Sequence, residues 1–459
     1  MLLTVTSRNV LLPDYDLPRP ATINVDLRTG KIIEVRLRYI GDGACRESWA
    51  PGELHFVDAG DKIVLPGLVD AHVHLEEPGN QDWEGFWTGT QAAAAGGVTT
   101  LIDMPVDSSP PTTTPRNLDI KRHSARGQCW VDVGFWGGAI PQNQAELGSL
   151  LSAGVRGFKC FLIDTGIEEF PCVSESDLHA HMSYLQNSVM IFHAEMQTAS
   201  SPAQHRLNPR SYQEFLSSRP KELEIDAITL ITRLQVIYPS VSCHIAHLSA
   251  AAALPIIRAA KKCGSKLSVE TCFHYLCLSA EDISDGATEY KCTPPIREDS
   301  NRNLLWDALV DGTIDCVTSD HSPCLIEMKG LERGDFMEAW GGVSSLGLGL
   351  SLLWTEGRKR GISLGQIIRW MSIRNAELAG LSGTKGQLKV GHDGDLVIWD
   401  PEPEFKVSKK HLYFKNKLTP YEGMTLKGLV HKTFVRGRLA YDSALQDGFT
   451  GLQPSGELL

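Results

Sequence analysis

The chain has 459 residues, of which 42% are hydrophobic and 22% charged, and this globular composition excludes a disordered or fibrous protein. Its 44 Lys and Arg against 55 Asp and Glu give a formal charge of -11, which argues against a nucleic-acid partner. No apolar run approaches the roughly 18 to 20 residues that cross a bilayer, so we expect no membrane partner. The 11 cysteines form no CxxC pair and fit reduced thiols, so we expect a cytoplasmic protein, with a peroxisomal location left open.

Residues 1–64 contain short alternating segments such as ATINVDL and KIIEVRL, which predict antiparallel strands. Residues 65–382 alternate short apolar runs, such as GVTTLIDMP, WVDVGFWGGA and SVMIFHAE, with stretches of helix length. Repeated βα units of this kind predict an α/β fold with a parallel sheet, and eight such strands fit a (β/α)8 TIM barrel. Residues 383–459 return to strand patterns, in GDLVIWDP and GLVHKTFVRGRLAYD, before a short tail. Both termini are therefore expected to build one small β-sandwich domain beside the barrel.

Polar side chains stand where five of the predicted barrel strands end. In a barrel of this type the C-terminal strand ends meet at one mouth, where catalytic groups are expected. The first strand run ends in Asp70, His72 and His74, and alternation along a strand points the two histidines to the same side. The candidates for a shared site are His72, His74, Lys159, His193, His247 and Asp320.

Four imidazoles and a carboxylate suit zinc or a similar divalent ion, and an open coordination position would carry water with a lowered pKa. The ammonium of Lys159 is electrostatically unfavourable among metal ions. It becomes favourable if the amine is carboxylated by CO₂, because the resulting carbamate can bridge two metals.

Other histidines have simpler interpretations. His179 and His181 share the HxH spacing but lie in a predicted helix, where side chains two residues apart point about 200° apart, so they are not expected to bind one metal. His244 precedes His247 by three residues and is expected to face the core. For His274, a substrate contact and a structural hydrogen bond both stay open.

The motifs DAHVHLEEPG, DWEG, GFKCF, HAE, HLS, SDHSP and KGQLKVGHDGDLVIWDP follow one another over nearly the whole chain. In this order they resemble the cyclic amidohydrolases of the amidohydrolase superfamily, and among these most closely the allantoinases. The resemblance implies two Zn²⁺ ions per subunit, one on His72, His74 and Asp320, the other on His193 and His247. It also implies that Lys159 bridges them as N6-carboxylysine, and that Asp320 is the catalytic base serving a metal-bridging hydroxide.

Positions at which this chain differs from related enzymes narrow the range of expected substrates. Dihydroorotases place an Arg two residues after the second His, where this chain has Glu76, a carboxylate that cannot bind the carboxylate of dihydroorotate. Dihydropyrimidinases and hydantoinases place an oxyanion-donating Tyr five residues after the Lys, where this chain has Asp164, so the oxyanion donor is unassigned. The stretches ETCFHYL, KCTPPIR, SDHSPC and AWGGV resemble those of allantoinases. They imply substrate contacts at Cys272, Ser322, Trp340, Gly341 and Gly342.

The resemblance implies hydrolysis of the small molecule allantoin to allantoate, a step of purine and ureide catabolism, by a homo-oligomer, expected to be a homotetramer. A hydantoinase or dihydropyrimidinase is the alternative among enzymes. A non-catalytic scaffold like the collapsin-response-mediator proteins is disfavoured, because those proteins lack most of the metal ligands and this chain keeps all six.

Overall fold

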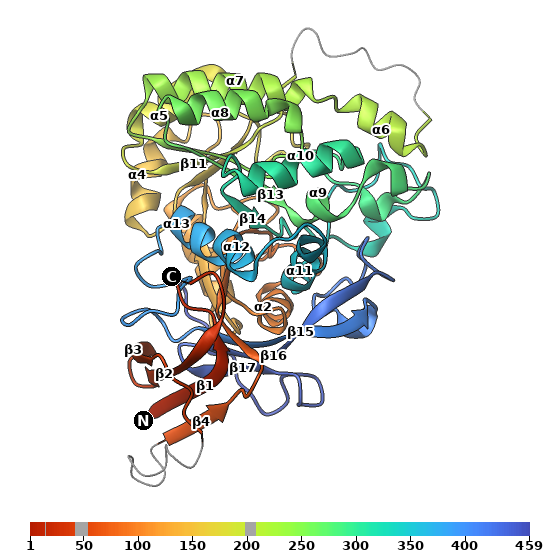
Figure 1. Ribbon diagram of the computed structural model, residues 1–459. Helices are drawn as coiled ribbons and strands as arrows, with labels where there is room; N and C mark the ends of the chain where they lie inside the picture. The colour runs from red at the N-terminus through yellow and green to blue at the C-terminus, as the bar shows by residue number, and fades with distance from the viewer. Residues whose placement is uncertain (14, 42–53, 198–207) are drawn as a thin grey trace.

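Both ends of the chain join in one eight-stranded sheet. The computed structural model describes residues 1–13, 15–41, 54–197 and 208–459, and in Figure 1 the red N-terminal and blue C-terminal strands lie together at the bottom of the view. The sheet has the order β17-β16-β15-β5-β1-β2-β3, with β4 beside β1. Its strands are β1 (Leu2–Val10), β2 (Arg19–Asp26), β3 (Lys31–Arg36), β4 (Leu54–Asp58), β5 (Ile63–Pro66), β15 (Leu396–Lys406), β16 (Thr425–Val435) and β17 (Arg438–Asp442).

Strand β5 connects the two ends of the chain within this sheet. It pairs in parallel with β1 and antiparallel with β15, so it spans the expected boundary after residue 64. Buried aliphatic residues of β1, β2, β5 and β15, among them Val5, Ile23, Val64 and Leu396, form a core of their own beneath the sheet. The sheet can bury that face only when both termini contribute strands.

Parallel strands form the barrel between these two halves of the sheet. They are β6 (Leu68–Val73), β7 (Val98–Asp103), β8 (Asp132–Phe135), β9 (Gly137–Gly138), β10 (Phe158–Phe161), β11 (Val189–His193), β12 (Ser242–Ile245), β13 (Leu267–Cys272) and β14 (Cys316–Thr318). Pairing runs β6-β7-β8 and β9 through β14, and a parallel bridge between Val73 and His321 joins the two ends. The prediction of a (β/α)8 barrel with a β-rich domain from both termini is confirmed.

The stretch WVDVGFWGGA was expected to form one strand, but the structure divides it into β8 and β9 at Trp136. This side chain is fully buried, and its indole N–H donates to the carbonyl oxygen of Ala71 at 2.8 Å. Together β8 and β9 occupy the third barrel position, because β8 pairs with β7 and β9 pairs with β10.

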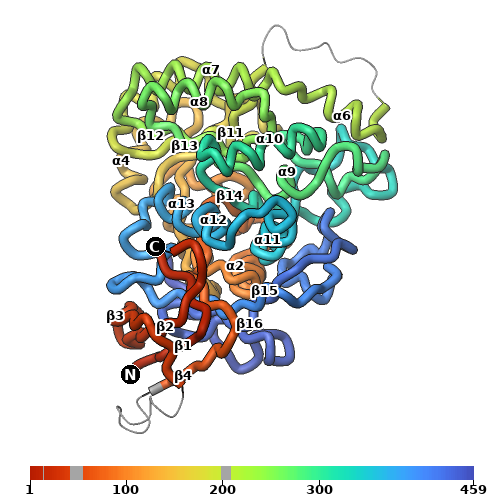
Figure 2. Tube along the Cα trace, in the orientation of Figure 1, coloured from red at the N-terminus to blue at the C-terminus, as the bar shows by residue number. Residues whose placement is uncertain are grey.

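Helices cover the outside of the barrel, as the tube in Figure 2 shows for α7, α8 and α10 to α13. Among the described residues none of them is both long and apolar enough to cross a membrane. The α-helices are α2 (Phe86–Ala95), α3 (Pro115–Ala125), α4 (Gln144–Ser152), α5 (Glu175–Tyr184), α6 (Tyr212–Ser218), α7 (Glu222–Ile237), α8 (Leu254–Lys262), α9 (Phe273–Cys277), α10 (Asp299–Val310), α11 (Gly349–Lys359), α12 (Leu364–Ile368) and α13 (Arg374–Leu378).

Candidate metal centre and substrate pocket

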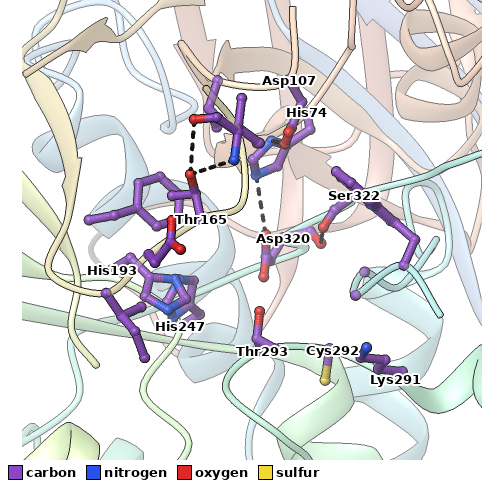
Figure 3. Close-up of a pocket in the computed structure, with 18 of the residues that line it drawn as sticks. His74, Asp107, Thr165, His193, His247, Lys291, Cys292, Thr293, Asp320 and Ser322 are labelled. Atoms are coloured by element: carbon purple, nitrogen blue, oxygen red, sulfur yellow. Dashed lines mark hydrogen bonds and ion pairs between the residues drawn. The ribbon is translucent and has the colours of Figure 1, made fainter. Parts of the chain in front are cut away.

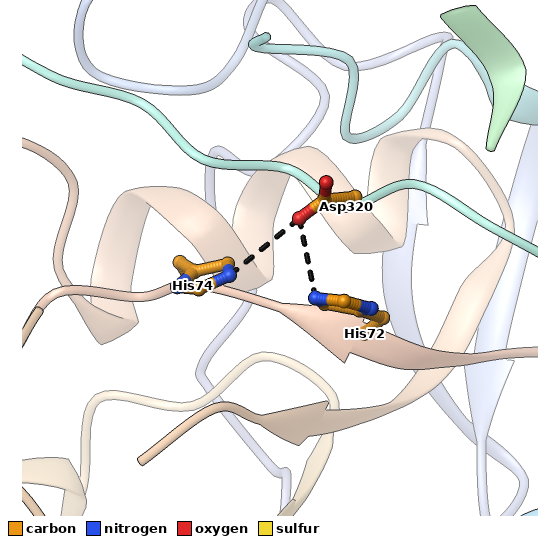
Figure 4. Close-up of side chains that lie close together, drawn as sticks. All are labelled: His72, His74 and Asp320. Carbon is orange, nitrogen blue, oxygen red and sulfur yellow. Dashed lines mark ion pairs between the residues drawn. The ribbon is translucent and has the colours of Figure 1, made fainter. Parts of the chain in front are cut away.

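His72, His74 and Asp320 converge although they come from opposite ends of the barrel sequence. His72 lies in β6, His74 follows its last residue, and Asp320 follows β14. The Nε2 atoms of His72 and His74 lie 3.2 and 3.5 Å from the same carboxylate oxygen of Asp320. Figure 4 shows both rings pointing to this oxygen. Their ligand atoms all lie within 4.8 Å of one another, close enough to hold one metal ion. The alternation of side chains along β6 therefore does bring both histidines to one point.

Asp320 is held there by an unusual backbone. Its φ is 42°, in the left-handed region that costs a non-glycine residue free energy and persists only where neighbours enforce it. The next residue, His321, is fully buried, and its Nδ1 accepts the backbone N–H groups of Ser345 and Leu346. Its Nε2 faces the buried carboxylate of Glu84 at 3.3 Å. The ring of His321 thus anchors the turn that presents Asp320 to the pocket.

The second group of candidate ligands lies next to the first. His193 ends β11, and its ring centroid lies 4.6 Å from that of His247, which in turn lies 5.5 Å from that of His72. Lys159 in β10 is 1% exposed and lines the same cavity. Figure 3 shows His193 and His247 side by side and Asp320 facing them across the cavity.

Three of the four candidate histidine ligands have a carboxylate next to one of their ring nitrogens. Glu270 contacts His72 Nδ1, and Asp107 lies 3.2 Å from His74 Nδ1. Glu195 lies 2.8 Å from His193 Nε2 and is itself held by Arg219. Carboxylates in this position fix the ring orientation and tautomer of metal-ligating histidines and increase their basicity. Each of these three histidines therefore offers its other nitrogen in a fixed direction.

Burial and neighbouring charge shift the pKa values of Lys159 and Asp320. Burial lowers the pKa of Lys159, although Asp320 and Glu270 oppose the shift, so the neutral amine that can react with CO₂ is favoured. Burial alone would raise the pKa of Asp320, but His72, His74 and His247 hold it well below the usual value. Four imidazoles, an ionised carboxylate and an amine that can be carboxylated form a donor set that fits zinc.

These side chains open into a cavity of about 270 Å³. All six predicted metal ligands line it, as do four of the five predicted substrate contacts, Ser322, Trp340, Gly341 and Gly342. Further lining residues are Val106, Asp107, Phe161, Ile163, Asp164, Thr165, Ile167, Arg219, Lys291, Cys292, Thr293, Glu338 and Ala339.

Cys272, the fifth predicted contact, does not line the cavity. It is fully buried at the end of β13, with its thiol 3.7 Å from the hydroxyl of Thr318. His274 is also fully buried outside the cavity lining, on α9, and its ring nitrogens have no hydrogen-bond partner among the described residues. The structure thus favours neither of the two roles left open for His274.

The other histidines lie as the sequence predicts. His179 and His181 are both on α5, whose first turn is capped by Ser174. His244 is buried in β12, with Nδ1 bonded to Ser268 and Nε2 bonded to Glu270. Because Glu270 also contacts His72, the core residue His244 is connected to the candidate metal centre through this carboxylate.

The sequence did not single out Glu270, Asp107, Arg219 or Lys291. Glu270 and Lys291 stand in motifs that were recognised, ETCFHYL and KCTPPIR, but nothing in the residue types distinguishes these positions. A carboxylate at the end of a predicted barrel strand, as Glu270 is in β13, is the one signal that could have indicated a partner for the histidines.

Comparisons with known proteins place the chain among relatives of similar length. The model of the amidohydrolase family matches residues 63–440. An allantoinase of Saccharomyces cerevisiae is 46% identical over 449 residues, which span 96% of this chain and 95% of the yeast protein. An allantoinase of Streptomyces avermitilis is 45% identical, spanning 100% of this chain and 98% of its own.

Solved structures of similar proteins share the whole architecture. An L-hydantoinase (dihydropyrimidinase) from Arthrobacter aurescens superimposes with a TM-score of 0.86 at 28% sequence identity, covering 99% of both chains. A dihydropyrimidinase from Brevibacillus agri reaches the same TM-score at 26% identity, covering 100% of this chain and 98% of its own.

Proposed function

The chain belongs to the amidohydrolase family, and on that premise we propose that it is an allantoinase, a metal-dependent hydrolase that opens the ring of allantoin to give allantoate. The observation that carries the proposal is the convergence of His72, His74 and Asp320 on a cavity of substrate size, in a chain matched end to end by allantoinases. Allantoin is a hydantoin ring bearing a ureido group, so the bond to be broken is a ring amide.

We propose two zinc ions, one on His72, His74 and Asp320 and the other on His193 and His247. Lys159 would bridge them after its neutral amine adds to the carbon of CO₂ and loses a proton, forming a carbamate. The bound metals would polarise the scissile carbonyl and lower the pKa of water. Support for the bridge comes from the burial of Lys159 and from its place in the cavity lining.

Asp320 is the group that moves the proton. Its carboxylate is ionised and reaches into the cavity, so it can accept a proton from the attacking water as the oxygen adds to the ring carbonyl. The same proton then passes to the ring nitrogen as the carbon–nitrogen bond breaks, which leaves a free N–H and a carboxylic acid that releases its own proton to solvent at neutral pH. The carboxylates behind His72, His74 and His193 keep the rings oriented throughout.

A hydantoinase or dihydropyrimidinase is the second candidate, because solved structures of those enzymes share the fold with a TM-score of 0.86. The identity of 45 to 46% to allantoinases, against 26 to 28% to these enzymes, favours allantoin. The non-catalytic scaffold is disfavoured, since all six candidate ligands line one cavity. The homotetramer that the family resemblance implies stays a prediction.

Product analysis by NMR tests the proposal. Zinc-supplemented protein is mixed with racemic allantoin, and with dihydrouracil and plain hydantoin in parallel. We expect rapid conversion of allantoin to allantoate and little change in the other rings. Opening of the other rings alone would make the protein a hydantoinase-type enzyme, and metal analysis of the same sample counts the bound zinc.

A further inference from the structure

Lys291 is a buried cation in the wall of the cavity that the hydrolysis reaction does not use. Its side chain is 8% exposed and lines the cavity next to Cys292 and Thr293. Figure 3 shows these three residues on the side of the cavity away from His74 and Asp107. Within the described part of the chain, the Lys291 ammonium forms no ion pair with a carboxylate, and its hydrogen bonds go to backbone carbonyls. A buried ammonium without a counter-ion is costly unless oxygen atoms surround it.

Backbone carbonyls hold the ammonium in place. Lys291 donates to the carbonyl oxygens of Met337 and Ala339, at 3.1 and 2.5 Å. Lys329 lies behind it and donates to the carbonyl oxygens of Lys291 and Trp340, at 3.2 and 3.0 Å, and to that of Gly342. Two of the three N–H groups of Lys291 thus bind carbonyl oxygens of the loop formed by residues 337–342. The third has no oxygen or nitrogen acceptor among the described residues, and the ammonium lies 5.6 Å from the ring centroid of Phe215.

Two cations, Lys329 and Arg219, act on Lys291, and the carboxylate of Asp335 offsets part of their charge; the net positive charge favours an oxygen-rich ligand. Arg219 also lines the cavity, but Glu195 already neutralises it through two hydrogen bonds. Burial, with Lys329 and Arg219, lowers the pKa of Lys291 to about 8, so at neutral pH it is still a cation. Lys291 is therefore a fixed, charged donor on the cavity wall with one bond left to make.

We propose that Lys291 is a specificity-determining residue that donates a hydrogen bond to an oxygen carried by the substituent of the substrate ring. This inference rests on the proposed function, because in allantoin that oxygen is the ureido carbonyl. A charged donor strengthens such a bond, and a ring without the substituent oxygen leaves the ammonium unsatisfied. The cavity would thus prefer rings with a ureido group to plain rings, although the scissile amide is the same in both.

The test compares kcat/KM for allantoin and for plain hydantoin in the zinc-supplemented wild type, Lys291→Met and Lys329→Met. Methionine keeps an unbranched chain at position 291 but removes the donor. We expect Lys291→Met to reduce the allantoin-to-hydantoin preference about 10- to 100-fold, mainly through the KM for allantoin. Lys329→Met is the matched control, because Lys329 holds the same loop but does not line the cavity. Lys329→Met should lower kcat/KM for allantoin and for hydantoin by the same factor, so the allantoin-to-hydantoin preference should not change.

An unchanged preference in Lys291→Met, or an equal loss of preference in Lys329→Met, would overturn the proposal and leave Lys291 as a brace for the loop. If Lys291→Met does not fold, as judged by thermal unfolding, Lys291→Gln retains a neutral donor and should show an intermediate preference. A wild type that opens hydantoin but not allantoin would instead contradict the proposed function. Failure of the two ideas is therefore distinguishable in one set of assays.

Discussion

At the scale of single residues, Lys159 has the least usual proposed role, because a lysine is ordinarily a solvated cation and here it is proposed to bind metal as a carbamate. It is 1% exposed among candidate metal ligands, and burial lowers the pKa of its amine. We expect Lys159→Ala to lose the bridging carbamate and with it at least about 100-fold in kcat, since metal ligands act as a unit in catalysis. Short carboxylic acids such as acetate or propionate should restore part of the activity, because the space left by the side chain admits a free carboxylate. Turnover is measured with and without added acid.

Lys159→Met is the matched control for this experiment. Its side chain fills the space that alanine leaves open, so added carboxylic acids should not restore activity in this variant. Full activity with two bound metals in Lys159→Ala would refute the bridging role.

The convergence of the candidate ligands at the strand ends could be predicted because their positions follow from the period of the strands. His72 and His74 lie two residues apart, and Asp320 lies where a later strand ends, so the sequence alone places them at one mouth. Glu270 could not be assigned in this way. It meets His72 across 198 positions of sequence, and only the closed barrel brings these two residues together.

At the scale of elements, a buried ion network joins the barrel to the sheet built from the termini. Lys385 contacts Asp132 at the start of β8 at 2.5 Å and Asp395, directly before β15, at 2.8 Å. It also contacts Asp393 at 2.8 Å, while Arg436, after β16, contacts Asp132. The three acidic groups could suggest a cation site, but the ammonium of Lys385 already occupies the position between them. The charges are thus paired within the protein.

Removal of Lys385 should be strongly destabilising. Lys385→Met removes the cation shared by three buried carboxylates, of which Asp132 keeps its contact with Arg436, and we expect a loss of about 3 to 5 kcal/mol in the free energy of unfolding. Burial alone would lower the pKa of Lys385, but the three aspartates raise it overall, so its contribution is present at neutral pH and is lost only as the pH rises above the usual lysine range. Urea titration at pH 7 measures the change.

Asp61→Asn provides the comparison for Lys385→Met. Asp61 pairs with Arg8 at 3.1 Å on the surface, with side chains 83% and 51% exposed, so its loss should cost less than about 1 kcal/mol. Equal effects of the two substitutions would contradict a structural role for the buried network.

Some elements could be placed from the sequence and others could not, and the difference has a physical reason. Helix α5 could be placed because Ser174 and Asp177 form a capping box, a signal contained within four residues. The break between β8 and β9 could not, because it depends on the indole of Trp136 reaching Ala71 on another strand. Local signals are readable in the sequence, whereas signals that depend on closure of the barrel are not.

At the scale of the whole molecule, the barrel and the terminal sheet are connected in several places. The backbone N–H of Lys415 lies 3.1 Å from the carboxylate of Glu84, and Asn416 donates to the carbonyl oxygen of Trp83 at 2.7 Å. Thr433 in β16 donates to the carbonyl oxygen of Ala94 in α2 at 2.7 Å. Glu84 in turn faces His321, so the contact from the connection between β15 and β16 reaches the residue next to Asp320.

These connections predict that the two parts unfold together. Strand β5 pairs with strands from both ends of the chain, so the sheet cannot separate without exposing its apolar face, and the Lys385 network would lose its partners at the same step. We expect hydrogen exchange with mass spectrometry, followed along a urea series, to show β1 and β11 losing protection at the same urea concentration. Earlier loss of protection in β1 while β11 stays protected would show that the barrel is stable on its own. In that case the contacts of Lys415 and Asn416 would position the active site without contributing to its stability.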